Sequence, residues 1–151
     1  MENEKQKEIV VAVSGGFDPI HPGHIRLFQE AKKLGTKLVV LLNNDNWLKK
    51  KKGYVFMSEL DRKEVIEAIK VVDEVILTSH SADPVDMSVG ADLAVIRPDI
   101  FAKGGAQTKD TIPEIAACKG MSCKIVFNIG YGGKIQSSSN LVTNFAKEDT
   151  A

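Results

Sequence analysis

Two histidines three residues apart, His21 and His24, stand at the start of the first expected helix. They follow an apolar segment that closes with Gly15 and Gly16, and a helix beginning near Pro22 would present unpaired backbone N–H groups beside them. Both side chains can project from one side of the chain and donate hydrogen bonds to phosphate oxygens. Either the pair binds a phosphate, or His21 shapes the turn and His24 caps the helix.

Asp18 lies between these glycines and histidines. Its carboxylate could orient a histidine, lie near a bound magnesium ion, or form an Asx turn before Pro19. The spacing favours none of the three.

Further basic and hydroxyl side chains fall in later segments. Lys49 to Lys52, before Gly53, are typical of a solvated loop, although their ammonium groups could close over a polyphosphate. Trp47 beside them is more typical of packing than of base stacking. Lys103 before Gly104 has the same two interpretations, a solvated charge or a phosphate ligand.

The hydroxyls of Ser137, Ser138 and Ser139 can cap the last helix or, after "GYGGK", form a second anion cradle. Arg62 lies off the apolar face of its expected helix, where an exposed salt bridge is the simplest interpretation.

Five apolar segments alternate with helical ones, a pattern typical of a doubly wound α/β fold with a parallel sheet and right-handed crossovers. The expected strands are residues 8–16, 36–45, 73–78, 99–105 and 123–130, and the expected helices are 24–35, 58–72, part of 83–98, 113–120 and 137–149. Gly35 is the expected cap of the first helix, and Ser58 that of the second. Val65, Ile66, Ile69 and Val72 are expected on one face.

The chain's 151 residues are the size of one domain. We expect a single domain over residues 1–151, with residues 1–7 a flexible start and residues 143–151 a C-terminal helix or tail. In such a sheet ligands bind beyond the carboxyl ends of the strands. The glycine-, lysine- or serine-rich segments described above follow the first, second, fourth and fifth expected strands, so all four fall at that edge.

Composition excludes several classes of protein. Twenty basic and twenty acidic residues cancel, which disfavours nucleic acid and acidic membrane surfaces as partners. No apolar stretch approaches the ~20 residues of a membrane span, and the polar start lacks a secretory signal, so we expect a cytoplasmic protein. Cys118 and Cys123 lack the partners of a zinc site, and two reduced thiols are expected. The chain has no GxxxxGK[ST], GxGxxG or GxSxG motif, which disfavours P-loop, dinucleotide-redox and α/β-hydrolase chemistry.

Three segments in order, "GGFDPIHPGH", "RKEVIEAIKVVDEV" and "KIQSSSNLV", resemble the signatures of the cytidylyltransferase-like branch of the HxGH nucleotidyltransferases. "DIFAKGG" resembles a segment of bacterial heptose-1-phosphate adenylyltransferases. The likeness runs from Val10 to Val142. It implies a Rossmann-like five-stranded sheet in the order 3-2-1-4-5 with helices on both faces.

The resemblance also assigns roles to residues. It implies catalysis by His21, His24, Lys52 and Arg62, and acceptor binding by Lys50, Lys52 and Arg62. The nucleotide-binding residues that it implies are Gly15, Gly16, Phe17, Asp18, His21, Gly23, His24, Lys103, Gly104, Gly132, Gly133, Lys134, Ser137, Ser138 and Ser139. It implies no protein-held metal. Ala106 stands where the heptose and glycerol-phosphate enzymes have an acidic residue, which puts the ribose or acceptor contact there in doubt.

The implied reaction is attack by a phosphate monoester on the α-phosphorus of ATP or CTP, with Mg²⁺ accompanying the triphosphate and pyrophosphate released. A sugar or polyol phosphate is the first acceptor hypothesis. The alternatives are an adenylyltransferase acting on FMN, nicotinamide mononucleotide or pantetheine phosphate, and a non-catalytic nucleotide-binding domain. The "VDEV" segment lies at a dimer interface in similar enzymes, which implies a homodimer.

Overall fold

The computed structural model describes residues 7–104, 113–129 and 138–149. Four of the candidate site residues, Gly132, Gly133, Lys134 and Ser137, lie outside these ranges, as does Ala106.

Five parallel strands form one sheet in the order β3-β2-β1-β4-β5, which confirms the expected fold class and strand order. They are β1 (Val10–Gly15), β2 (Lys37–Leu42), β3 (Glu74–Leu77), β4 (Ile100–Gly104) and β5 (Lys124–Ile129). The central strands are nearly continuous apolar runs because helices cover both faces of the sheet. The direction in which successive strands are added reverses at β1, which lies between β2 and β4. Ligands bind at such a point in a parallel sheet, so the expected ligand crevice lies beyond Gly15.

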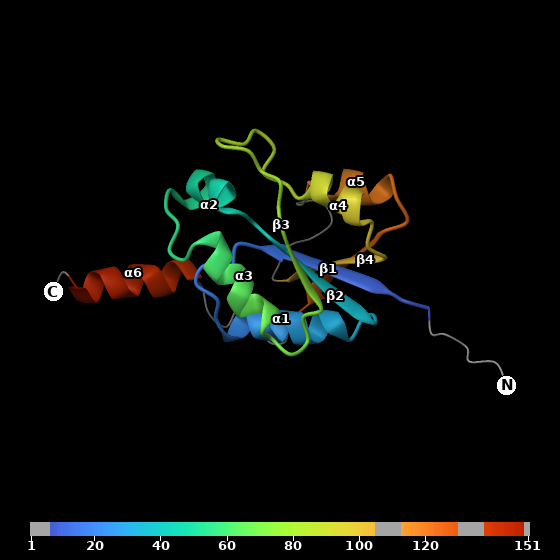
Figure 1. Cartoon of the computed structure of the whole chain (residues 1–151), viewed down its shortest axis with the longest axis horizontal. Coiled ribbons are helices and arrows are strands. Elements are labelled where there is room, and N and C mark those ends of the chain that lie inside the picture. The colour runs from blue at the N-terminus through green and yellow to red at the C-terminus, as the bar shows by residue number, and fades with distance from the viewer. Residues whose placement is uncertain (1–6, 105–112, 130–137, 150–151) are drawn as a thin grey trace.

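Within the described ranges, six helices connect and extend the sheet. They are α1 (Pro22–Lys32), α2 (Asp45–Lys52), α3 (Glu59–Glu67), α4 (Gly90–Ile96), α5 (Ile115–Lys119) and α6 (Ser138–Asp149). Figure 1 shows α1 and α3 on one side of the sheet and α4 and α5 on the other, with α6 extending away from the body. No described helix is long and apolar enough to cross a membrane.

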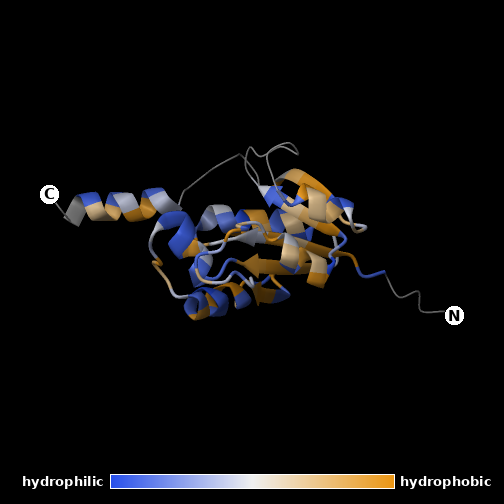
Figure 2. Cartoon of the chain, turned by 90° about the horizontal axis from the view of Figure 1, so that it is seen from above, coloured by the Kyte–Doolittle hydropathy of each residue, from blue (hydrophilic) through white to orange (hydrophobic). Residues whose placement is uncertain are grey.

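The sheet separates two hydrophobic cores. Phe28 of α1 and Ile66 of α3 pack on one face against Val13, Val40 and other strand residues. On the opposite face, Leu93 of α4 and Cys118 of α5 pack against other strand residues. These are Ala12, Leu41 and Phe101. Figure 2 shows hydrophobic residues concentrated in the strands of the sheet.

The lysine-rich stretch is a helix, α2, so its interpretation as a loop was wrong. Asn44 caps the helix by accepting a hydrogen bond from the Trp47 backbone N–H at 3.0 Å, and Gly53 ends it with a φ of 82°. The lysines in the last turn also interact favourably with the negative end of the helix dipole.

Other local expectations need smaller corrections. Lys33, not Gly35, caps α1, and a Cβ on Gly35 would lie 2.5 Å from the backbone oxygen of Ile9, so a close approach explains this glycine. Ser58 caps α3 as expected, accepting from the Asp61 N–H at 3.3 Å. The helix ends at Glu67, however, and Val65 is exposed.

Candidate functional site

The two histidines cap the first turn of α1 reciprocally. Nδ1 of His21 accepts a hydrogen bond from the Gly23 N–H at 3.1 Å, and Nδ1 of His24 accepts one from the His21 N–H at 3.2 Å. Their rings stack with centroids 3.7 Å apart. The capping interpretation is therefore confirmed. The capping hydrogen bonds use Nδ1 of each ring and not Nε2.

This capping determines which nitrogen carries the proton. Because Nδ1 of His24 accepts a hydrogen bond, the ring proton of neutral His24 resides on Nε2. Burial, His21 and Lys52 together lower the pKa of His24 to about 3. At neutral pH His24 is thus an uncharged ring that can donate from Nε2 at the positive end of a helix.

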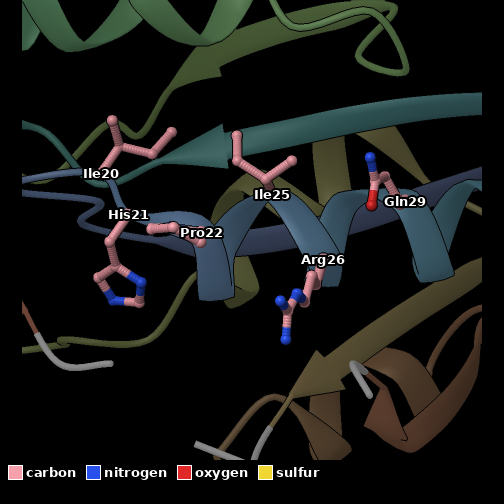
Figure 3. Close-up of a pocket in the computed structure, with 6 residues that line it drawn as sticks. All are labelled: Ile20, His21, Pro22, Ile25, Arg26 and Gln29. Atoms are coloured by element: carbon pink, nitrogen blue, oxygen red, sulfur yellow. The ribbon is translucent and has the colours of Figure 1, made fainter. Parts of the chain in front are cut away.

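A groove of about 390 Å³ runs along the outer side of α1 from His21. Figure 3 shows the side chains of His21 and Arg26 pointing to the same side of the helix. The groove shares only His21 with the site residues inferred from sequence. Arg26 adds a cation near the first turn. It was not among the predicted site residues, because a single exposed arginine on a helix carries no distinctive signal in the sequence.

Asp18 joins the loop after β1 to the segment before α3. The side chain is fully buried, and its carboxylate accepts hydrogen bonds from the backbone N–H groups of Phe56 at 2.7 Å and Met57 at 2.6 Å. None of the three roles weighed from the sequence describes these contacts. A role of Asp18 in nucleotide binding stays a prediction.

Arg62 is 1% exposed, so the expectation of an exposed salt bridge was wrong. Its guanidinium donates to the backbone oxygens of Met57 at 2.9 Å, Gly16 at 2.8 Å and Asn43 at 2.7 Å. It also forms an ion pair with Asp45 at 2.7 Å. Four of the five guanidinium N–H groups are thereby used, and they hold the carboxyl ends of β1 and β2 together.

The lysines of α2 differ in their surroundings. Burial lowers the pKa of Lys52, Asp18 opposes this shift, and Arg62 adds to it. Lys52 also lowers the pKa of His24, so its ammonium group acts on the same site. Lys50 instead forms an exposed ion pair with Asp83 at 2.6 Å. The structure therefore brings Lys52, but not Lys50, to the histidines.

The glycines of the first motif make room for side chains. A Cβ on Gly15 would lie 2.8 Å from the Phe17 ring, and one on Gly16 would lie 2.9 Å from Leu48. A Cβ on Gly23 would lie 2.8 Å from the His21 ring. Phe17 is buried, with its ring edge-to-face with His24 at 4.8 Å. Close packing of the loop is thus one reason for these glycines.

The start of α6 reaches the first motif. Ser138 is buried, and its hydroxyl donates to the backbone oxygen of Pro19 at 2.6 Å, whereas Ser139 is exposed. This contact brings the third sequence signature to the first.

Lys103 lies at the end of β4, next to Gly104. Its ammonium nitrogen is 5.5 Å from the centre of the Phe101 ring. Burial lowers the pKa of Lys103, and Glu114 opposes this shift. A Cβ on Gly104 would lie 3.2 Å from the backbone oxygen of Ile129, so this glycine lets β4 approach β5 closely.

Metal-binding clusters can be sought only among the described residues, and there no three His, Cys, Asp or Glu side chains converge. Both oxygens of the Asp18 carboxylate already accept backbone N–H groups. A Mg²⁺ ion that accompanies the nucleotide stays a prediction. The Cys118 and Cys123 sulfurs lie 3.3 Å apart as free thiols.

The family model described as cytidylyltransferase-like matches residues 12–140, almost the whole of the chain that carries these features. The chain belongs to the cytidylyltransferase-like family. This confirms the family inferred from the three sequence signatures.

Two names recur among curated proteins that are similar to this cytidylyltransferase-like protein. A FAD synthase from Ferroglobus placidus is 42% identical over 66% of this chain and 61% of its own length. A FAD synthase from Methanobrevibacter smithii is 32% identical over 92% of each chain. The bifunctional protein HldE of Methylobacillus flagellatus is 33% identical over 93% of this chain but only 28% of its own length. The chain thus spans less than two thirds of two of these relatives.

A solved structure shares the fold of this cytidylyltransferase-like protein. The lipopolysaccharide core biosynthesis protein from Thermoplasma volcanium superposes with a TM-score of 0.65 and 32% identity, covering 83% of this chain and 99% of that one.

Chemically, the described site of this cytidylyltransferase-like protein suits an anion. It combines the Nε2–H of His24, the N-terminus of α1 and the ammonium group of Lys52. Such groups stabilise negative charge without a covalent intermediate. The catalytic and binding roles of the individual residues stay predictions.

Proposed function

We propose that this protein is an adenylyltransferase that forms FAD from ATP and FMN. The observation that carries the proposal is the match to the Methanobrevibacter smithii FAD synthase over 92% of both chains. The likeness to the Ferroglobus placidus FAD synthase supports it. FAD contains an AMP unit, which favours ATP over CTP as the nucleotide donor.

In the proposed reaction a phosphate oxygen of FMN attacks the α-phosphorus of ATP. A new P–O bond forms the diphosphate of FAD, and the bond from the α-phosphorus to the departing pyrophosphate breaks. Mg²⁺ bound to the triphosphate would neutralise part of its charge. The protein's task is then to hold the two phosphates together and to stabilise the charge that builds during transfer.

The site residues described above have different roles in this proposal. His24 donates from Nε2 to an oxygen of the reacting phosphate, and the stacked His21 keeps the first turn of α1 in place. Lys52 supplies positive charge from the end of α2. Arg62 and Asp18 are positioning residues, because their hydrogen bonds fix the loops that carry the other groups.

Transfer to a sugar or polyol phosphate is the second candidate function. The likeness to HldE over 93% of this chain favours it, as does the "DIFAKGG" segment. The HldE match covers only 28% of that relative, so the likeness concerns one part of a larger protein.

The test is an assay with Mg²⁺, ATP or CTP, and one of three acceptors: FMN, heptose 1-phosphate or glycerol 3-phosphate. We expect FAD, seen by chromatography, and an equal amount of pyrophosphate only with ATP and FMN. Turnover with a sugar or polyol phosphate and none with FMN would contradict the first proposal and support the second candidate function. Absence of pyrophosphate with every pair would overturn both.

A further inference from the structure

Asn43, the first residue after β2, buries a hydrogen-bond acceptor that nothing in the described structure satisfies. The residue is 4% exposed, and Oδ1 of its carboxamide has no partner among the described residues. Its backbone is fully used: the N–H donates to Gly15 at 2.9 Å, and the oxygen accepts from Arg62 at 2.7 Å. A buried acceptor without a donor is costly, so a ligand that donates a hydrogen bond would stabilise it.

The neighbouring Asn44 shows what a structural asparagine looks like at this place. Its Oδ1 caps α2 at Trp47, and its Nδ2 donates to the backbone oxygens of Thr78 at 3.0 Å and His80 at 2.8 Å. Asn44 therefore holds the end of β2 to the segment after β3. The Asn43 carboxamide makes no such bond within the described residues, which sets it apart as a group available for recognition.

Strand alternation places Asn43 on the side of the sheet opposite the histidine helix. Leu41 packs in the core under α4 and α5, and the backbone bond from Asn43 to Gly15 continues the strand ladder, so Asn43 follows Leu41 onto that side. Lys103 follows Phe101 of the same core in the same way. Two polar side chains thus lie at the carboxyl edge of the sheet, across it from the groups proposed to bind phosphate.

Trp47 provides a fixed flat surface next to this edge. Its indole N–H donates to the backbone oxygen of Met87 at 2.9 Å, and a ring carbon lies 3.4 Å from the position of a Cβ on Gly16. The ring is therefore anchored at its polar end while its other end lies beside the loop after β1. A planar ligand can stack on such a surface.

We propose that Asn43 recognises the heterocycle of the acceptor, with its carboxamide paired to the imide edge of the flavin beside Trp47. A carboxamide offers one acceptor and one donor side by side, and the flavin imide presents the complementary N–H and carbonyl oxygen. A sugar or polyol phosphate has no such edge. The inference rests on FMN being the acceptor, as proposed above, and it names the specificity-determining residue.

The test combines one variant with one altered ligand. FMN binding is measured by fluorescence titration for the wild type and Asn43→Ala, each with FMN and with FMN methylated on the imide nitrogen. We expect methylation to weaken binding to the wild type about tenfold or more, and Asn43→Ala to weaken FMN binding by a similar factor. The variant should no longer distinguish the two flavins, and its KM for ATP should stay at the wild-type value.

Stability measurements exclude a merely structural role. Asn43→Ala removes no side-chain hydrogen bond of the described structure, so its urea midpoint should equal or exceed that of the wild type. The matched variant Asn44→Ala should lower the midpoint, since it breaks the bonds to Trp47, Thr78 and His80. The inference is overturned if the wild type binds both flavins equally, or if Asn43→Ala still prefers unmethylated FMN. If FAD still forms when either of these results is observed, only this inference is wrong. If the protein does not bind FMN at all, the proposed function is wrong as well.

Discussion

At the scale of single residues, the two ring nitrogens of His24 can serve two different tasks. Nδ1 of His24 caps α1, and the same bond directs the ring proton to Nε2. The spacing of His21 and His24 left capping and phosphate binding as alternatives, but an imidazole can do both. Only atomic positions show this, because the sequence does not say which nitrogen faces the backbone.

Two substitutions at His24 separate these tasks. In His24→Asn the side-chain oxygen can replace Nδ1 as the cap, but no donor remains at the position of Nε2. In His24→Gln the amide N–H can approach the position of Nε2. We expect His24→Asn to reduce kcat for pyrophosphate release about 10²- to 10³-fold, and His24→Gln to reduce it less.

The control for both variants is the urea midpoint, which should stay near the wild-type value for His24→Asn because the cap is kept. Equal kcat for the wild type and His24→Asn would exclude Nε2 as a catalytic donor.

At the scale of elements, the strands and their order were predictable, but the contacts that join the loops were not. Buried parallel strands are near-continuous apolar runs, and β1 and β2 show this clearly. The bond from Arg62 to Gly16 spans 46 residues, and those from Asp18 to the segment before α3 span 38 and 39. No local pattern encodes such pairs, so a positioning role was not visible in the sequence.

The lysine stretch shows a second limit. Four successive lysines suggest a solvated loop because charge repulsion disfavours compact structure. Asn44 at the start and Gly53 at the end were the available signals for a helix, and they outweighed the repulsion. As a helix, α2 directs Lys52 toward Asp18 and His24 and leaves Lys51 exposed.

The geometry of α2 predicts different effects of two adjacent substitutions. Lys52→Met removes the charge that acts on His24, and we expect it to reduce kcat/KM at least about tenfold. Lys51→Met changes an exposed side chain on the same turn and should leave kcat/KM within about twofold. Steady-state assays of both proteins at one ionic strength make the comparison. Equal losses in the two variants would mean that general attraction of anions by α2, and not the position of Lys52, is responsible.

At the scale of the whole molecule, the sheet edge divides the proposed work between two faces. His24 lies in α1, and Lys52 at the end of α2 acts on it electrostatically, so charge on phosphates would be stabilised there. Asn43, which is buried, and Lys103 lie on the side of α4 and α5. A ligand with a phosphate at one end and a planar ring at the other would reach across this edge.

Burial of a neutral histidine also makes the stability of the whole molecule depend on pH. The pKa of His24 falls from 6.5 to about 3 on folding, so between these values the unfolded chain binds a proton that the folded chain does not. Stability therefore rises with pH in this window, is complete above 6.5, and is lost as pH falls toward 3. Asp73, whose pKa is also lowered on folding, adds its own loss only near and below its ordinary value of 3.8.

The measurement is urea unfolding of the wild type and His24→Asn at several pH values from 7.5 to 4.5, and because both proteins share the same carboxylates, their titration cancels in the difference. We expect the free energy of unfolding of the wild type to fall by about 3 kcal/mol more than that of the variant over this range. His24→Asn retains the cap but cannot be protonated, so the difference between the two curves isolates the histidine. Parallel curves would show that His24 titrates alike in the folded and unfolded protein, and the neutral donor inferred for the phosphate site would then be wrong.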